Sequence, residues 1–265
     1  MSRVLLAALF LALTARSLLA QATGVPVYDE SRIGRVDAVA RQAATVLKKA
    51  GGLLSFSEVG KQLTQRQQCS IHLPPPSKEK LASRELWNRA RLSHLRVGWL
   101  YKDHEKPRWQ VNLAGGFAIT SDGAVATCYH VVEPHASEMK EGYLVVATDD
   151  DDVYPATEIL AASHDMDTCI LRVKADNLTP LPLSSDIYPG DPVVCFSEPM
   201  GRRGFYSTSH VNRFVQRPTV PLKRKETPPE RLPVFLEVGN DWAPGSSGAA
   251  VLDLFGNAVG QVATI

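Results

Sequence analysis

The sequence lacks the long apolar run that a membrane-spanning helix requires, because its longest run, Val4 to Leu13, has ten residues. It also lacks excess charge: 29 basic residues nearly balance 28 acidic ones, so the charge does not indicate a nucleic-acid partner. No Cys-x-x-Cys pair is present. A composition that is 44% hydrophobic, with 18 Gly and 18 Pro, excludes collagen-like, coiled-coil and wholly disordered chains.

The first 22 residues have the pattern of a secretory signal peptide. Arg3 supplies the basic start, the apolar run comes next, and Ala20 and Ala22 suit a cleavage site. An uncleaved membrane anchor is the alternative for the same pattern. We expect an exported protein, periplasmic or extracellular, that is not inserted in a membrane after cleavage of the signal.

A chain of this length can build its core without disulfide bonds between its four cysteines. Export permits disulfides, and four cysteines allow three complete pairings. Cys128, Cys169 and Cys195 stand in apolar runs, which favours buried free thiols. Cys69 and His72 could form half of a zinc site, but the sequence offers no second half. We therefore expect no metal and no organic cofactor.

Residues 23–92 are predicted to form a small helical region. Apolar residues recur at three- and four-residue steps from Ser31 to Ala50, and Ser57 can cap a second, short helix. A third, charged segment runs from Lys78 to Arg91 behind a stretch of three prolines, with Ser77 at its start. The region shows no evident chemistry, so we expect it to pack on the β-rich remainder of the chain.

From residue 93 onward, short runs rich in β-branched and aromatic residues alternate with turn residues. The expected strands are Arg96 to Tyr101, Val111 to Thr120, Ala124 to Tyr129, Tyr143 to Thr148, Cys169 to Val173, Val193 to Phe196, Tyr206 to Phe214, Pro233 to Val238, Ala249 to Leu252 and Ala258 to Thr264. Such a series predicts a mostly β, antiparallel barrel or sandwich. The turn cluster Asp186 to Asp191 divides it into halves, about 93–180 and 181–265. Asp149 to Asp152 are expected to form a solvated hairpin turn rather than a calcium loop.

Three segments carry candidate chemistry: Ala126 to Val132 around His130, His164 to Leu171 around Asp167, and Ala243 to Val251 around Ser247. In the order His, Asp, Ser, they resemble the trypsin-like serine peptidases, and most closely the HtrA/Deg-like branch. Leu181 to Leu183, Gly190 to Val194 and Pro199 to Gly201 resemble the entry to that family's second barrel.

The resemblance implies two six-stranded antiparallel β-barrels in residues 93–265, without room for a PDZ domain. The sequence ends soon after the run that matches one wall of the substrate pocket. The second barrel therefore either keeps an open edge or continues beyond the given sequence.

The resemblance also implies the role of each site residue. Ser247 would attack the peptide carbonyl, His130 would take the proton of Ser247, and Asp167 would orient His130. The backbone N–H groups of Gly245 and Ser247 would form the oxyanion hole. A secreted serine endopeptidase is thus expected, a hydrolase that cleaves protein or peptide substrates through an acyl-enzyme intermediate.

Each of these residues has a rival nearby in the sequence. Asp165 could replace Asp167, Ser246 could replace Ser247, and His135 and His164 are the other histidines close to the motifs. The family pattern favours Asp167, directly before the apolar strand, and Ser247, directly before Gly248-Ala249.

The substrate pocket is less well defined by the sequence. Asp241 stands six residues before Ser247, where a pocket acid would select Lys or Arg, while Trp242 and Gly260 are candidates for the pocket wall.

Two other functions remain open at this point. A peptidase fold that binds peptides without cutting them is the main alternative. An esterase is a weaker one, because the Gly-x-Ser-x-Gly elbow is broken by Ala249. The sequence does not indicate an oligomeric state.

Overall fold

The computed structural model describes residues 27–28, 38–105, 108–135, 139–217, 232–239 and 241–263. All of its helices and strands belong to one compact unit, Gly34–Ile265, and of the other unit, Met1–Ile33, only Val27 and Tyr28 are described. The expected signal peptide, residues 1–22, lies outside the described residues. No helix in the described part of the chain has the length and apolar character needed to cross a membrane.

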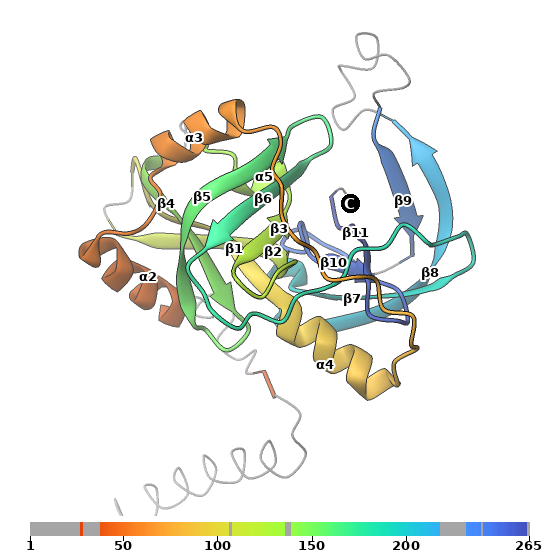
Figure 1. Cartoon of the computed structure of the whole chain (residues 1–265). Helices are drawn as coiled ribbons and strands as arrows, with labels where there is room; N and C mark the ends of the chain where they lie inside the picture. Colours follow the sequence, from red (N-terminus) through yellow and green to blue (C-terminus); the bar gives the residue numbers. More distant parts are fainter. Residues whose placement is uncertain are drawn as a thin grey trace, which may run out of the picture. The chain divides into compact units, whose positions relative to one another are not determined.

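The first six strands form a closed antiparallel barrel (Figure 1). They are β1 (His94–Asp103), β2 (Gln110–Ala118), β3 (Ala124–Thr127), β4 (Met139–Thr148), β5 (Val153–Ser163) and β6 (Thr168–Val173), in the order β1-β2-β3-β6-β5-β4. Strand β1 is buried on both faces, since Val97 and Trp99 belong to the barrel core while Leu100 packs with Ala44 outside it. The predicted first barrel is confirmed.

The remaining five strands form a second, curled sheet. They are β7 (Pro192–Ser197), β8 (Phe205–Gln216), β9 (Val234–Val238), β10 (Ala250–Leu252) and β11 (Ala258–Gln261), in the order β11-β10-β7-β8-β9. Among the described residues no strand joins β9 to β11, so this sheet is a half-barrel with two edges. The mostly β architecture is as predicted, and so is the incomplete second barrel.

Strand β5 is absent from the sequence-based expectations, although it is eleven residues long. Its pairing with β6 shifts register between Ala156 and Glu158 and again between Ile159 and Ala161. Each shift interrupts the alternation of apolar and polar positions by which a strand is recognised. The sequence pattern of β5 is therefore that of neither a regular strand nor a helix.

The helical region contains α2 (Ala38–Ala50), α3 (Phe56–Gln65) and α4 (Ser83–Ser93). The cap of α3 is Ser55 and not Ser57, because Ser55 and Glu58 form a reciprocal capping box. Helix α4 begins five residues later than expected. Ser77, the expected start, is held by backbone bonds to the Asn257 side chain instead, at 2.7 and 3.0 Å.

These helices pack directly on the two sheets (Figure 1). Val59 and Leu63 of α3 are buried in the core of the first barrel. Leu86 and Ala90 of α4 are buried against a cluster that includes Phe196 of β7. The helical region thus supplies part of both cores.

The four cysteines are free: Cys69 is exposed, and Cys128, Cys169 and Cys195 are buried. Burial raises the pKa of each buried thiol, that of Cys195 to about 12. These thiols are therefore neutral at physiological pH, as expected for apolar core positions.

The acidic run at Asp149 to Asp152 does form the turn between β4 and β5, with Thr148 N donating to Asp152 O at 2.9 Å. The sequence predicts a solvated turn, but in the structure part of this turn is buried. Asp149 is buried and pairs with Arg91, whereas Asp150 is exposed. Buried arginines nearby, which the sequence pattern does not reveal, account for the difference.

Replacing Leu86 with Ala should lower the free energy of unfolding by about 2–5 kcal/mol, because the change leaves a cavity between α4 and the second sheet. Leu92→Ala on the same helix is the matched control. Leu86 is 3% exposed and Leu92 is 51% exposed, so the control should change stability by less than about 0.5 kcal/mol. Urea denaturation measures both, and equal losses would contradict the packing of α4.

Candidate active site

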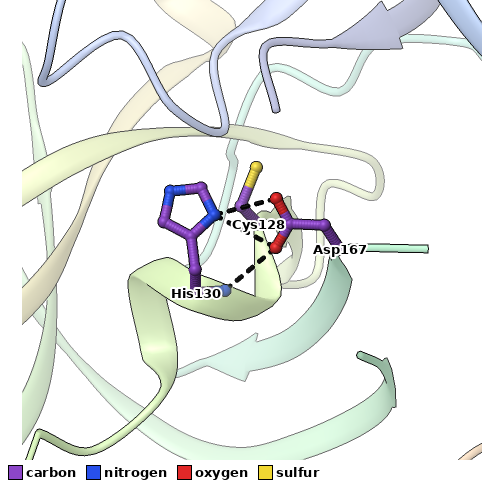
Figure 2. Close-up of side chains that lie close together, drawn as sticks. All are labelled: Cys128, His130 and Asp167. Carbon is purple, nitrogen blue, oxygen red and sulfur yellow. Dashed lines mark hydrogen bonds and ion pairs between the residues drawn. The ribbon is translucent and has the colours of Figure 1, made fainter. Parts of the chain in front are cut away.

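His130 lies on the one-turn helix α5 (Tyr129–Val132), which directly follows β3. The sequence had suggested a strand as far as Tyr129, but the strand ends at Thr127. Figure 2 shows Nδ1 of His130 facing the carboxylate of Asp167, at 2.8 Å from Oδ2 and 3.0 Å from Oδ1. The backbone N–H of His130 also donates to Asp167 Oδ1, at 3.0 Å. The Asp167 carboxylate thus fixes both the imidazole ring and the backbone of His130.

Asp167 ends the turn between β5 and β6, where its φ of 47° places it in the left-handed region. Its side chain is only 5% exposed, while that of His130 is 44% exposed. A buried carboxylate next to a solvent-accessible imidazole leaves the other ring nitrogen, Nε2, available for chemistry. Such an arrangement fixes the tautomer with the proton on Nδ1.

Gln261 of β11 holds this turn from the second sheet. Its Nε2 donates to the backbone oxygen of Asp167 and to Thr168 Oγ1, both at 3.0 Å. No motif in the sequence had pointed to this residue. The one signal for it was an amide side chain in an otherwise apolar run.

The turn that carries Ser247 is fixed against the first barrel by backbone contacts. Gly115 N of β2 donates to Ser247 O at 2.7 Å, and Gly248 N donates to Val262 O at 2.7 Å. Gly248 has a φ of +83°, and a Cβ there would lie 2.1 Å from Gly115 O. Only glycine allows this approach.

The same glycine lies beside the segment that leads to His130. A Cβ on Gly248 would be 2.5 Å from Thr127 Oγ1, and Thr127 ends β3, three residues before His130. Ser247 is partly buried, and no hydrogen bond joins its hydroxyl to His130 in the part of the chain described. Catalytic hydrogen bonds are often long without substrate and shorten only in the complex.

In the serine turn, two backbone N–H groups have no hydrogen-bond acceptor among the described residues. Ser246 N donates to Ala243 O at 3.0 Å and Ala249 N donates to Ser246 O at 3.1 Å. The N–H groups of Gly245 and Ser247 donate no hydrogen bond to other described residues. Two free backbone donors next to a serine can bind a developing oxyanion.

The rival residues occupy different surroundings. Asp165 and His164 are both exposed and pair with each other at 3.7 Å, and His135 is exposed as well. Ser246 is fully buried, with its hydroxyl 3.2 Å from that of Ser197. None of these four has the buried bond to a neighbouring acid or base that joins Asp167 to His130.

A cavity of about 610 Å³ lies between β9 and β11. Its lining mixes apolar side chains, among them Phe235, Leu236 and Trp242, with the polar ones of Asn212, Arg217, Glu237 and Gln261. Gly260 also lines it, as do Met166 and Thr168 on either side of Asp167. The candidate pocket residues Trp242 and Gly260 therefore line it. Asp241 is exposed and does not line it.

Cys128, which no motif had indicated, completes a group of three possible metal ligands. Its sulfur and the ligand atoms of His130 and Asp167 lie within 4.8 Å of one another (Figure 2). Burial and the neighbouring Asp167 raise the pKa of this thiol, which donates to Val262 O at 3.1 Å. A neutral thiol is a poor ligand, so the group fits a histidine–acid pair better than a cation site. Cys69 and His72 do not belong to a cluster of metal ligands in the described part of the chain.

A model of the trypsin-like peptidase domain family matches residues 114–260, more than half of the chain. The match spans β2 to β11 almost completely and includes His130, Asp167 and Ser247. No curated protein sequence matches the chain significantly.

Replacing Gly248 with Ala should lower the free energy of unfolding by more than about 2 kcal/mol, since the new methyl group strains the backbone and collides with Gly115 O. Gly190→Ala is the matched control, because Gly190 has a φ of +96° but nothing within 4 Å of an added Cβ. The control should cost only the backbone strain, about 1–2 kcal/mol. Urea denaturation measures the free energy of unfolding of both variants. An equal decrease in the two would show that the contact between Gly248 and β2 does not contribute to stability.

Proposed function

The chain belongs to the trypsin-like peptidase family, and from that premise we propose that it is an active serine endopeptidase with His130, Asp167 and Ser247 as its catalytic residues. The observation that carries the proposal is the bond between the buried Asp167 carboxylate and Nδ1 of His130. A histidine oriented by a buried acid is what a serine peptidase needs, and this favours the peptidase over a protein that only binds peptides.

In the proposed reaction, Ser247 Oγ attacks the carbonyl carbon of the substrate. A hydroxyl is a weak nucleophile, so Nε2 of His130 accepts its proton as the new C–O bond forms. The imidazolium that results is stabilised by Asp167, which keeps its negative charge. The partial exposure of His130 allows the substrate to reach Nε2.

The carbonyl oxygen becomes an oxyanion in the same step. The N–H groups of Gly245 and Ser247 would donate to it. His130 then returns the proton to the leaving amine, the peptide bond breaks, and an ester joins Ser247 to the acyl half of the substrate. Water, activated by the same histidine, attacks the ester and releases Ser247.

Within the family, we assign the chain to the HtrA/Deg-like branch on the segments Leu181 to Leu183, Gly190 to Val194 and Pro199 to Gly201. The leader-like residues 1–22 support export to the periplasm or beyond the cell. Protein and peptide chains are the proposed substrates. The cavity lined by Trp242 and Gly260 would receive the side chain that precedes the cleaved bond.

A fluorophosphonate probe should label the wild-type protein on Ser247, because the activated hydroxyl displaces fluoride from phosphorus. Ser247→Ala and His130→Ala should both abolish labelling. His164→Ala is the matched control for the histidine, since the acid paired with His164 is the exposed Asp165 and not Asp167. Gel fluorescence and mass spectrometry of the labelled peptide measure the outcome.

Labelling of a different serine would overturn the assignment of Ser247. A folded wild-type protein without any labelling would instead support the alternative, a peptidase fold that binds peptides without cutting them.

Asp167→Asn should reduce the rate of labelling by about 10⁴-fold, because an amide NH₂ cannot accept the Nδ1 proton and the wrong tautomer is favoured. The amide oxygen can still accept the backbone N–H of His130, so the fold should be preserved. Asp165→Asn, two residues away and exposed, should leave the rate unchanged. Similar rates for both variants would make Asp165 or another group the partner of His130.

A further inference from the structure

A cluster of charged side chains is buried between the first barrel, α4 and the second sheet. Arg96 of β1 is its centre, with a side chain that is only 1% exposed. The members of this ion cluster are Arg91, Arg96, Asp149, Asp151, Glu198 and Arg203. Burial of so many charges is costly unless they are paired, so the geometry of each pair matters.

Asp151 joins the two inner arginines. One of its oxygens accepts a hydrogen bond from Arg96, and the other accepts one from Arg203 Nη1 at 2.9 Å. Arg96 also donates to Thr148 O, at 3.1 Å from Nη2. The turn between β4 and β5 is therefore held by both strand β1 and the connection from β7 to β8.

The remaining contacts are longer ion pairs. Glu198 lies 3.6 Å from Arg96 Nε and 3.8 Å from Arg203 Nε, and Asp149 lies 3.8 Å from Arg203 and 3.4 Å from Arg91. His94 is buried next to these arginines, and burial together with their charge lowers its pKa to about 3. It is therefore uncharged. The three arginines face the three carboxylates of the cluster, and Arg91 also pairs with the exposed Asp150 at 3.6 Å.

The connection from β7 to β8, which contributes Glu198 and Arg203, also touches the serine turn. Met200 N donates to Pro244 O at 2.7 Å. A Cβ on Gly245 would lie 2.5 Å from Glu198 O, so these two backbones are in close contact. The Gly245 N–H, a donor of the proposed oxyanion hole, therefore has its position set by the residues that the ion cluster holds.

We propose that Arg203, held by Asp151, is a positioning residue for the oxyanion hole. It fixes the connection Glu198–Arg203, and this connection supports the backbone of Pro244 and Gly245. The inference rests on the proposed peptidase function for its catalytic meaning, but its mechanical part can be measured without activity. Neither Arg203 nor Asp151 lines the cavity that is proposed to receive the substrate side chain.

Arg203→Gln removes the charge that Asp151 binds. Arg202→Gln is the matched control, because Arg202 is the exposed neighbour and undergoes the same change of charge. Asp151→Asn is a second test from the other side of the pair, and an Asn tolerates the positive φ of 68° at this position. All variants are made in the full chain.

Hydrogen–deuterium exchange of the peptide that covers residues 243–248 is the first measurement. Arg203→Gln and Asp151→Asn should speed exchange in this turn severalfold, with β2, β3 and β6 unchanged, while Arg202→Gln should match the wild type. An unchanged rate of exchange in residues 243–248 of both variants would overturn the proposal. Faster exchange throughout both sheets would also overturn it, because a general loss of stability would then be the cause.

The second measurement is the rate of fluorophosphonate labelling. A displaced oxyanion donor should slow it by up to about 10²-fold in Arg203→Gln and Asp151→Asn, with Ser247 still the labelled residue. A rate equal to that of the wild type, despite faster exchange of the turn, would overturn the role in the oxyanion hole. A wild type that is not labelled at all refutes the peptidase function instead, and the exchange experiment alone then decides whether Arg203 positions the turn.

Discussion

The close approach of the Gly248 backbone to Gly115 and Thr127 is the contact on which the candidate site depends. The first barrel holds His130 and Asp167, and the second sheet carries Ser247, so neither sheet has a complete site. A side chain at position 248 would force the two apart, because the distance from its Cβ to Gly115 O would be 2.1 Å. Gln261 secures the same junction from β11 by binding the backbone of Asp167. Together with the bond from Gly115 N to Ser247 O, these contacts hold the serine turn close to the segment that carries His130.

Much of this site could be predicted from the sequence because its residues stand in short segments with strong local constraints. His130 follows a strand of small buried residues, and Gly245 and Gly248 adopt positive φ angles that favour glycine. Small residues and glycines in this arrangement are visible without a structure. The sequence pattern alone does not show how far apart the three segments lie in the folded chain. Only the resemblance to the family predicts that they lie close together. In the structure, the bond between His130 and Asp167 joins two of the three segments.

The features that were missed depend on tertiary contacts. Strand β5 has two register shifts that remove its alternation, and α5 replaces the end of a predicted strand. The acidic run at the β4–β5 turn has the appearance of a solvated loop, yet Asp149 and Asp151 turn inward because buried Arg96 and Arg203 require partners. A single charged residue in a strand pattern does not show that its partner lies about fifty residues away.

The five strands of the second sheet, β7 to β11, are arranged in the same order as the first five strands of the first barrel. The second sheet lacks a described counterpart of β6. In the first barrel β6 lies between β3 and β5 and begins directly after Asp167. The corresponding place in the second sheet, between β9 and β11, is where the cavity lies. Because Met166 and Thr168 also line this cavity, it lies next to the turn that carries Asp167. In the proposed reaction, the first barrel would therefore supply the base, and the second sheet would supply both the nucleophile and the surface that aligns the substrate with it.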